Sequence, residues 1–106
     1  MIAKVSEDEK RVTVSLSGDL NLATSSEVRK VLSEVSKSDS DKEIVVDVSN
    51  VRVIDSMGLA TLIGGLKASR DKNVKFALAG VKGNVEEVLK ISGLDSIFDR
   101  ADAHAD

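Results

Sequence analysis

The stretch EIVVDVSNVRVIDSMGL, residues 43–59, decides the fold of this 106-residue chain. Residues 44–48 form a nearly continuous apolar run, which is typical of a central strand covered on both faces. Ser49 and Asn50 interrupt that run, and residues 51–54 then lead into a helix that is expected to begin near Ser56. A buried strand followed by a helix predicts crossover connections and parallel strand pairing.

Patterns of apolar residues typical of strands and of helices also occur on either side of this stretch. Residues 1–7 and 11–17 are predicted to be strands joined by a charged turn, and the second alternates cleanly between apolar and polar residues. Residues 74–79 predict a further strand, closed by Gly80. Apolar residues at helical spacing predict three helices, which contain Val28, Val31, Leu32 and Val35, then Leu59, Leu62, Ile63 and Leu66, then Val85, Val88 and Leu89.

The ends of two helices also carry local signals. Thr24 with Glu27, and Asn84 with Glu87, have the spacing of capping boxes that start the first and third helices. Gly93 is well placed to end the third helix.

These elements define an α/β protein. We expect a small mixed, largely parallel sheet of about five strands packed against three or more helices. Residues 1–100 are expected to form one domain, and residues 101–106 a polar, frayed tail.

Composition excludes several classes of function. A net charge of −3 argues against a nucleic-acid surface, and Phe76 and Phe98 are the only aromatic residues. No apolar run reaches the roughly 20 residues of a membrane span, and residues 1–11 do not resemble a signal peptide. We therefore expect a cytoplasmic protein with no nucleic-acid partner and no direct membrane insertion.

The sequence contains few residues that are suited to catalysis or to metal binding. There is no Cys, and the one His, His104, lies in the polar tail. Asp19, Asp47 and Asp55 have no spacing that matches a metal-binding loop. The sequence predicts no enzyme, no metal site and no cofactor.

Ser56 lies where a short apolar run meets the second helix. The unsatisfied N–H groups of a helix start favour an anion, including a phosphate, at this position. The simpler alternative is that Asp55 or Ser56 serves only as an N-cap, worth about 1 kcal/mol.

The helix after Ser56 has an unusual composition. Residues 56–66 include no charged side chain, and one face carries the small or weakly polar residues Met57, Ala60, Thr61, Gly64 and Ala68. Two explanations remain open: neighbouring elements bury this face, or another protein docks on it.

Several segments resemble the STAS domain family, which includes the bacterial anti-sigma factor antagonists. Residues 43–51 and 53–59 look like the family signature, and residues 18–21 (GDLN) are similar to an earlier turn of the family. Residues 91–94 through Phe98 are similar to its last helix and closing strand. Met57 and Asn21 depart from the residues common in the family at those positions.

The resemblance implies a partner switch. In such antagonists the residue matching Ser56 is phosphorylated by a Ser/Thr kinase that often doubles as an anti-sigma factor, and a separate phosphatase removes the phosphate. Only the unmodified form binds its partner. The predicted partner-binding residues are Asp19, Asn21, Asp55, Met57, Gly58, Leu59, Ala60, Thr61 and Gly64.

Two alternatives come from other classes of protein. Some single STAS domains are cytoplasmic subunits of membrane lipid ABC transporters that contact the ATPase. The sequence Asp55-Ser56-Met57 also resembles the phosphopantetheine attachment site of carrier proteins, but those are helical bundles without strands.

Overall fold

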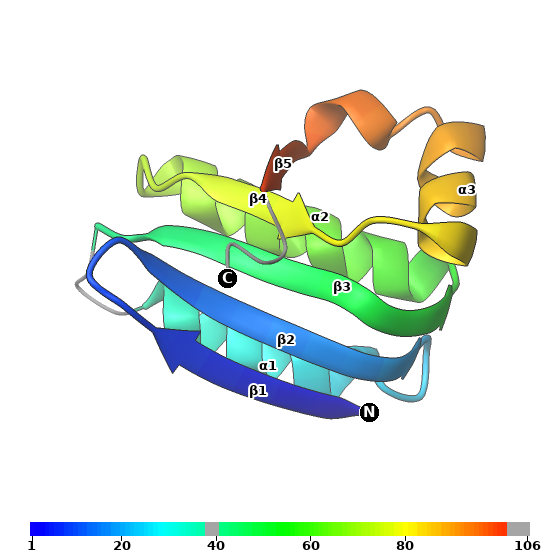
Figure 1. Ribbon diagram of the computed structural model, residues 1–106, viewed down its shortest axis with the longest axis horizontal. Helices are drawn as coiled ribbons and strands as arrows, with labels where there is room; N and C mark the ends of the chain where they lie inside the picture. The colour runs from blue at the N-terminus through cyan, green and yellow to red at the C-terminus, as the bar shows by residue number, and fades with distance from the viewer. Residues whose placement is uncertain (38–40, 102–106) are drawn as a thin grey trace.

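The computed structural model describes residues 1–37 and 41–101, which form a five-stranded sheet in the order β1-β2-β3-β4-β5 (Figure 1). The strands are β1 (Ile2–Glu7), β2 (Arg11–Leu20), β3 (Glu43–Ile54), β4 (Phe76–Ala79) and β5 (Asp99–Ala101). β1 pairs antiparallel with β2, and the other neighbours pair in parallel. The predicted mixed, largely parallel sheet is confirmed.

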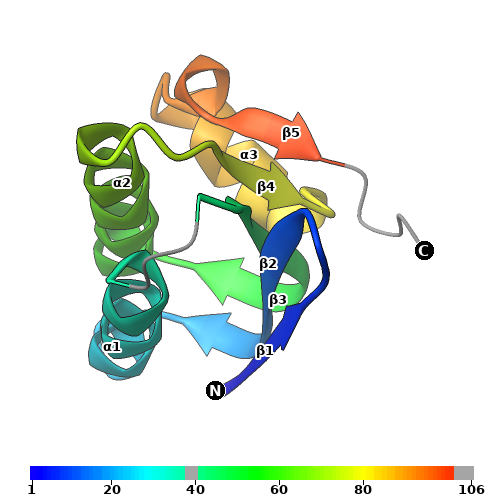
Figure 2. The ribbon, with the colours of Figure 1, turned by 90° about the vertical axis from the view of Figure 1, so that its left-hand side faces the viewer.

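Two of the helices cover one face of the sheet. α1 (Ser25–Ser36) and α2 (Ser56–Asp71) lie side by side on that face (Figure 2), whereas α3 (Gly83–Ile91) lies beyond the end of β4, beside the C-terminal part of β3 (Figure 1). A short 3₁₀ turn, η1 (Asp95–Ile97), connects α3 to β5. Among the described residues, no helix is both long enough and apolar enough to span a membrane.

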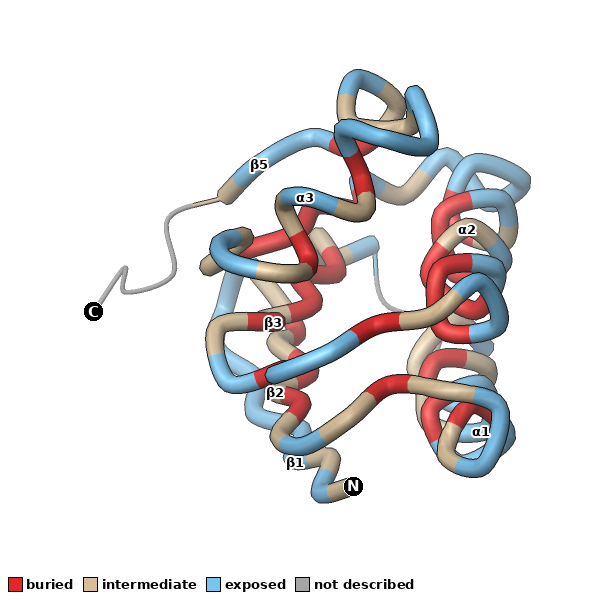
Figure 3. Tube along the Cα trace, turned by 90° about the vertical axis from the view of Figure 1, so that its right-hand side faces the viewer, coloured by how far each residue is buried: buried red, intermediate tan, exposed pale blue. Residues whose placement is uncertain are grey.

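The main core lies between the sheet and the helices (Figure 3). Val14 and Val46 from the sheet and Leu62 from α2 are fully buried, as are Val85 and Leu89 of α3. Each such side chain contributes about 1.5–3 kcal/mol relative to an exposed one. The apolar spacing that predicted the helices therefore marks their inner faces.

β3 continues through the residues predicted to interrupt it. Asp47 pairs with Ser15 and Asn50 pairs with Ser17, so β3 has one residue more than β2 between these pairs. This irregularity has the form of a β-bulge, which accommodates an extra residue without ending the strand. The N–H of Ser49 donates to the Asp47 carboxylate at 2.9 Å. The predicted break was wrong because the bulge and this local bond accept the polar residues.

Both predicted capping boxes are absent, because their side chains have other partners. Thr24 is the N-cap of α1, but its hydroxyl accepts the N–H of Asn21 and donates to the Asp19 carbonyl. α3 begins at Gly83, and the Asn84 side chain accepts the N–H of Ile54 at 2.9 Å.

The predicted end of α3 is confirmed. Gly93 has φ +75°, and its N–H donates to the Lys90 carbonyl, while the Leu94 N–H donates to the Leu89 carbonyl. These two bonds form the Schellman motif, which a glycine in the left-handed conformation favours. Farther on, Ala101 ends β5 instead of beginning the tail, because β4 supplies it with a parallel neighbour. The rest of the predicted tail, residues 102–106, lies outside the described residues.

Candidate functional site

Asp55 caps the start of α2. Its backbone is extended, and one carboxylate oxygen accepts the N–H groups of Met57 at 3.0 Å and Gly58 at 2.9 Å. The other oxygen accepts the N–H of Leu22 at 3.2 Å, so this one side chain also ties the loop after β2 to α2. Asp55, and not Ser56, is therefore the N-cap of α2.

Ser56 is the first residue of α2, and it is exposed. Its hydroxyl makes no hydrogen bond to any residue that the structure describes. The dipole of α2 gives this end of the helix a partial positive charge, which the Asp55 carboxylate already meets through the N–H groups of Met57 and Gly58. The site therefore combines an accessible hydroxyl with a backbone that tolerates negative charge.

Three of the predicted partner-binding residues lie in the interior. A side chain at Gly58 would meet the Leu20 carbonyl oxygen at 2.4 Å, so Gly58 allows α2 to start directly against the end of β2. Leu59 is 7% exposed and Thr61 is 4% exposed, and the Thr61 hydroxyl donates to the Met57 carbonyl. Gly58, Leu59 and Thr61 therefore position the surface of α2 and offer a partner almost no contact area.

Other predicted residues do face outward, and the structure adds two more. Met57 is 38% exposed, and Ala60 and Gly64 are also exposed. The sequence missed Leu22, which is 69% exposed, and Val53, which is 43% exposed. We call Leu22, Val53, Ser56 and Met57 the switch surface. Leu22 joins it through the bond to Asp55, a contact that no local sequence pattern reports.

Asp19 and Asn21 are half-buried and already hydrogen-bonded. The Arg52 guanidinium donates to both Asp19 carboxylate oxygens, at 3.1 Å and 2.9 Å. This hydrogen bond, aided by the positive charge of Arg52, holds the pKa of Asp19 below its ordinary value of 3.8. The Asn21 side-chain oxygen accepts the N–H groups of Ala23 and Thr24. Both residues shape the loop that presents Leu22.

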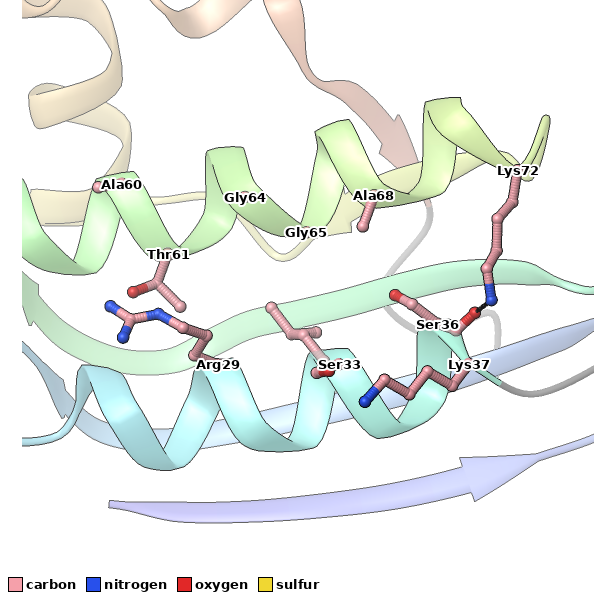
Figure 4. Close-up of a pocket in the computed structure, with 11 residues that line it drawn as sticks. Arg29, Ser33, Ser36, Lys37, Ala60, Thr61, Gly64, Gly65, Ala68 and Lys72 are labelled. Atoms are coloured by element: carbon pink, nitrogen blue, oxygen red, sulfur yellow. Dashed lines mark hydrogen bonds between the residues drawn. The ribbon is translucent and has the colours of Figure 1, made fainter.

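Burial within the domain accounts for only part of the uncharged helix face. Thr61 and Gly65 are buried against the rest of the domain, whereas Ala60 and Gly64 remain exposed. The exposed part borders a groove of about 390 Å³ between α1 and α2 (Figure 4). The residues that line it are Arg29, Leu32, Ser33, Ser36, Lys37, Ala60, Thr61, Gly64, Gly65, Ala68 and Lys72.

Within residues 1–37 and 41–101, no three His, Cys, Asp or Glu side chains lie close enough together to hold an ion. The oxygens of Asp55 and Asp47 instead accept backbone N–H groups of their own neighbourhoods.

The fold and the helix start at Ser56 agree with a family assignment. Residues 2–106 match the model of the STAS domain, and the chain belongs to that family. It is 29% identical over 90 residues to an anti-sigma-B factor antagonist of Staphylococcus aureus, covering 85% of this chain and 82% of the relative. It is 33% identical over 85 residues to an anti-sigma F factor antagonist of Paenibacillus polymyxa, covering 80% and 73%.

Solved structures give the same result. A crystal structure of a Thermotoga maritima protein superposes with a TM-score of 0.86 at 26% identity, over 97% of this chain and 88% of the other. The resemblance to the STAS family and the predicted fold class are both confirmed.

Proposed function

We propose that this protein is a partner-switching regulator of the anti-sigma factor antagonist type. Its unmodified form binds a Ser/Thr kinase or anti-sigma factor through the switch surface, and phosphorylation of Ser56 releases that partner. The observation that carries the proposal is the exposed, unbonded hydroxyl of Ser56 beside a cap supplied by Asp55. The similarity to two named anti-sigma factor antagonists supports it.

Phosphorylation should leave the fold unchanged. A phosphate adds about −1.5 to −2 charges. The start of α2 favours that charge by roughly 0.3–1 kcal/mol, and the neighbouring Asp55 carboxylate opposes it. Because these effects are small and opposite, the modification acts on binding instead of on folding.

At a docked interface the same charge has a large effect. The switch surface has three exposed apolar side chains, those of Leu22, Val53 and Met57. A bound partner would bury them and exclude water from them. Removing a dianion from water without a basic partner costs several kcal/mol. A loss of about 4 kcal/mol weakens binding roughly a thousandfold.

The protein itself needs no catalytic group for this role. The kinase supplies the phosphate, and a Ser/Thr phosphatase acting on phosphorylated Ser56 restores the binding form. In the described part of the chain, Ser56 has no hydrogen-bonded base that would make it a nucleophile.

The test is capture of partners from a lysate of the source organism. Wild type, Ser56→Ala and Ser56→Asp serve as bait, with Ser26→Asp as the control, because Ser26 is likewise exposed in the first turn of a helix. We expect a Ser/Thr kinase with wild type, Ser56→Ala and Ser26→Asp, and its loss with Ser56→Asp. Equal kinase capture by Ser56→Asp would overturn the switch.

The same experiment separates the rival functions. Capture of a transporter ATPase by every variant would identify a transporter subunit instead. Intact-mass measurement after incubation with Mg-ATP and the captured kinase should show one added phosphate on wild type and none on Ser56→Ala. A phosphopantetheine-sized addition on Ser56 would mean a carrier protein.

A further inference from the structure

The groove between α1 and α2 has apolar surface between the two helices and small residues along one wall. Leu32 comes from α1, and Ala60, Gly64 and Ala68 follow one another along α2. Figure 4 shows the two helices running side by side along its length. Because Ala60 lies within one helical turn of Met57, the groove continues directly from the switch surface.

Gly64 keeps this groove open without serving the fold. A Cβ at Gly64 would meet no atom within 4 Å, whereas one at Gly65 would lie 3.0 Å from the Phe76 ring and 3.1 Å from Leu32. Packing therefore accounts for Gly65 alone. A glycine inside a helix destabilises that helix relative to alanine. Gly64 thus weakens α2 and provides room for something outside the domain.

The charges around the groove have one sign. Its lining includes Arg29, Lys37 and Lys72 and no acidic residue among those described, although the chain as a whole carries a net charge of −3. Lys72 donates to the Ser36 carbonyl and so also serves the end of α1. Arg29 lies at the opposite end of the groove, far from either helix C-terminus (Figure 4). The groove thus has positive charge at both ends.

We propose that this groove binds an acidic, amphipathic helix of the same partner that contacts Ser56, an inference that rests on the proposed function. Arg29 lies in α1 and Lys37 caps its C-terminal end, eight residues later, which is about 12 Å along the helix axis. Two carboxylates separated by about two turns of a bound helix match that spacing, and small apolar side chains between them fit against Ala60 and Gly64. A fatty acid, which carries one charged group, would satisfy only one end.

The probe is a synthetic helical peptide of about 15 residues, roughly four turns. It carries Leu and Ala on one face, two Glu two turns apart, and a single Trp on the opposite face. A second peptide replaces both Glu with Gln. Because the protein contains no Trp and no Tyr, the fluorescence anisotropy of the peptide Trp reports binding to the full chain without background.

Two kinds of variant test the groove: one reverses the charges at its ends, and the other fills it with a larger side chain. Arg29→Glu with Lys37→Glu is compared with Lys30→Glu and Lys67→Glu, an exposed pair outside the lining with the same change of net charge. At low salt we expect the double substitution in the groove to weaken binding of the Glu peptide about tenfold. The control double substitution should weaken it less than about threefold. Gly64→Leu should weaken binding of both peptides, because its side chain fills the groove. Circular dichroism checks that each variant is folded.

The outcomes separate this inference from the switch. Ser56→Asp should bind the Glu peptide within about twofold of wild type, because the peptide lies beyond the start of α2. Equal binding of the Glu and Gln peptides, or equal effects of the two charge-reversed pairs, would overturn the groove proposal and leave the switch standing. Binding of sodium laurate without binding of the Glu peptide would also overturn it and indicate a lipid site.

Discussion

Alanine at two glycines of the same helix should change stability in opposite directions. In Gly58→Ala the new methyl group would lie 2.4 Å from the Leu20 carbonyl oxygen and 2.8 Å from its Cγ atom. Overpacking of this kind costs about 1–3 kcal/mol, and here the crowded atom is backbone that cannot rotate away. A shift of the helix start would also disturb the Gly58 N–H bond to Asp55, worth about 1 kcal/mol.

The gain from alanine only partly offsets this loss. Replacing a helical glycine stabilises by about 0.5–1 kcal/mol, so we expect Gly58→Ala to destabilise the protein by about 2 kcal/mol. In Gly64→Ala nothing opposes the gain, because the methyl group enters open space. The two variants should therefore differ by about 3 kcal/mol. Gly65→Ala, at 3.0 Å from Phe76, should lie between them.

Urea unfolding followed by circular dichroism measures these differences directly. The free energy of unfolding should fall for Gly58→Ala and rise for Gly64→Ala, with unchanged dependence on urea concentration. A thermal melt should show the same order, with about 4 °C per kcal/mol for a chain of this size. A destabilised Gly64→Ala would refute the reasoning, since it would mean that the fold itself requires this glycine.

Two further predictions concern the ends of the strands next to α2. Asp55→Ala removes the acceptor of three backbone N–H groups and should lower the free energy of unfolding by about 2 kcal/mol in urea, whereas Ser56→Ala should change it by less than about 0.5 kcal/mol. Arg52→Met should raise the pKa of Asp19 toward 3.8 in an NMR titration and leave Asp8, whose pKa is lowered mainly by backbone N–H groups, unchanged. The pKa of Asp19 is lower in the folded protein than in the unfolded chain. The ion pair of Asp19 with Arg52 therefore stabilises the fold above about pH 4, and this stabilisation is lost as the pH falls through the lowered pKa. A variant in which Asp19 keeps its low pKa would show that Arg52 is not the cause.

The architecture could be predicted because its signals are local. The alternation in β2 and the apolar spacing in α1 and α2 each reflect which side of one element is buried, and neighbouring residues contain that information. The φ > 0 position at Gly93 is equally local, since only the chain around it decides how α3 ends. These features therefore agree between sequence and structure.

The site was only partly predictable because its contacts are distant in sequence. The Leu22 N–H bonds to Asp55, 33 residues away, and the Asn84 side chain bonds to Ile54, 30 residues away. No spacing within a helix reveals such partners. Likewise, Thr61 is buried and Gly64 is exposed although both belong to one uncharged face, a difference that the spacing within the helix does not reveal.

The division of roles between Asp55 and Ser56 explains how a switch can act here without disturbing the fold. If Ser56 were the N-cap, its hydroxyl would hold the first turn of α2, and modifying it would remove a bond worth about 1 kcal/mol. Asp55 instead makes every capping bond with its carboxylate. Charge can then be added to Ser56 while the helix start stays intact, so folding and partner binding can vary independently. A Ser56→Asp variant that loses its partner and also unfolds in distinctly less urea than wild type would contradict this separation.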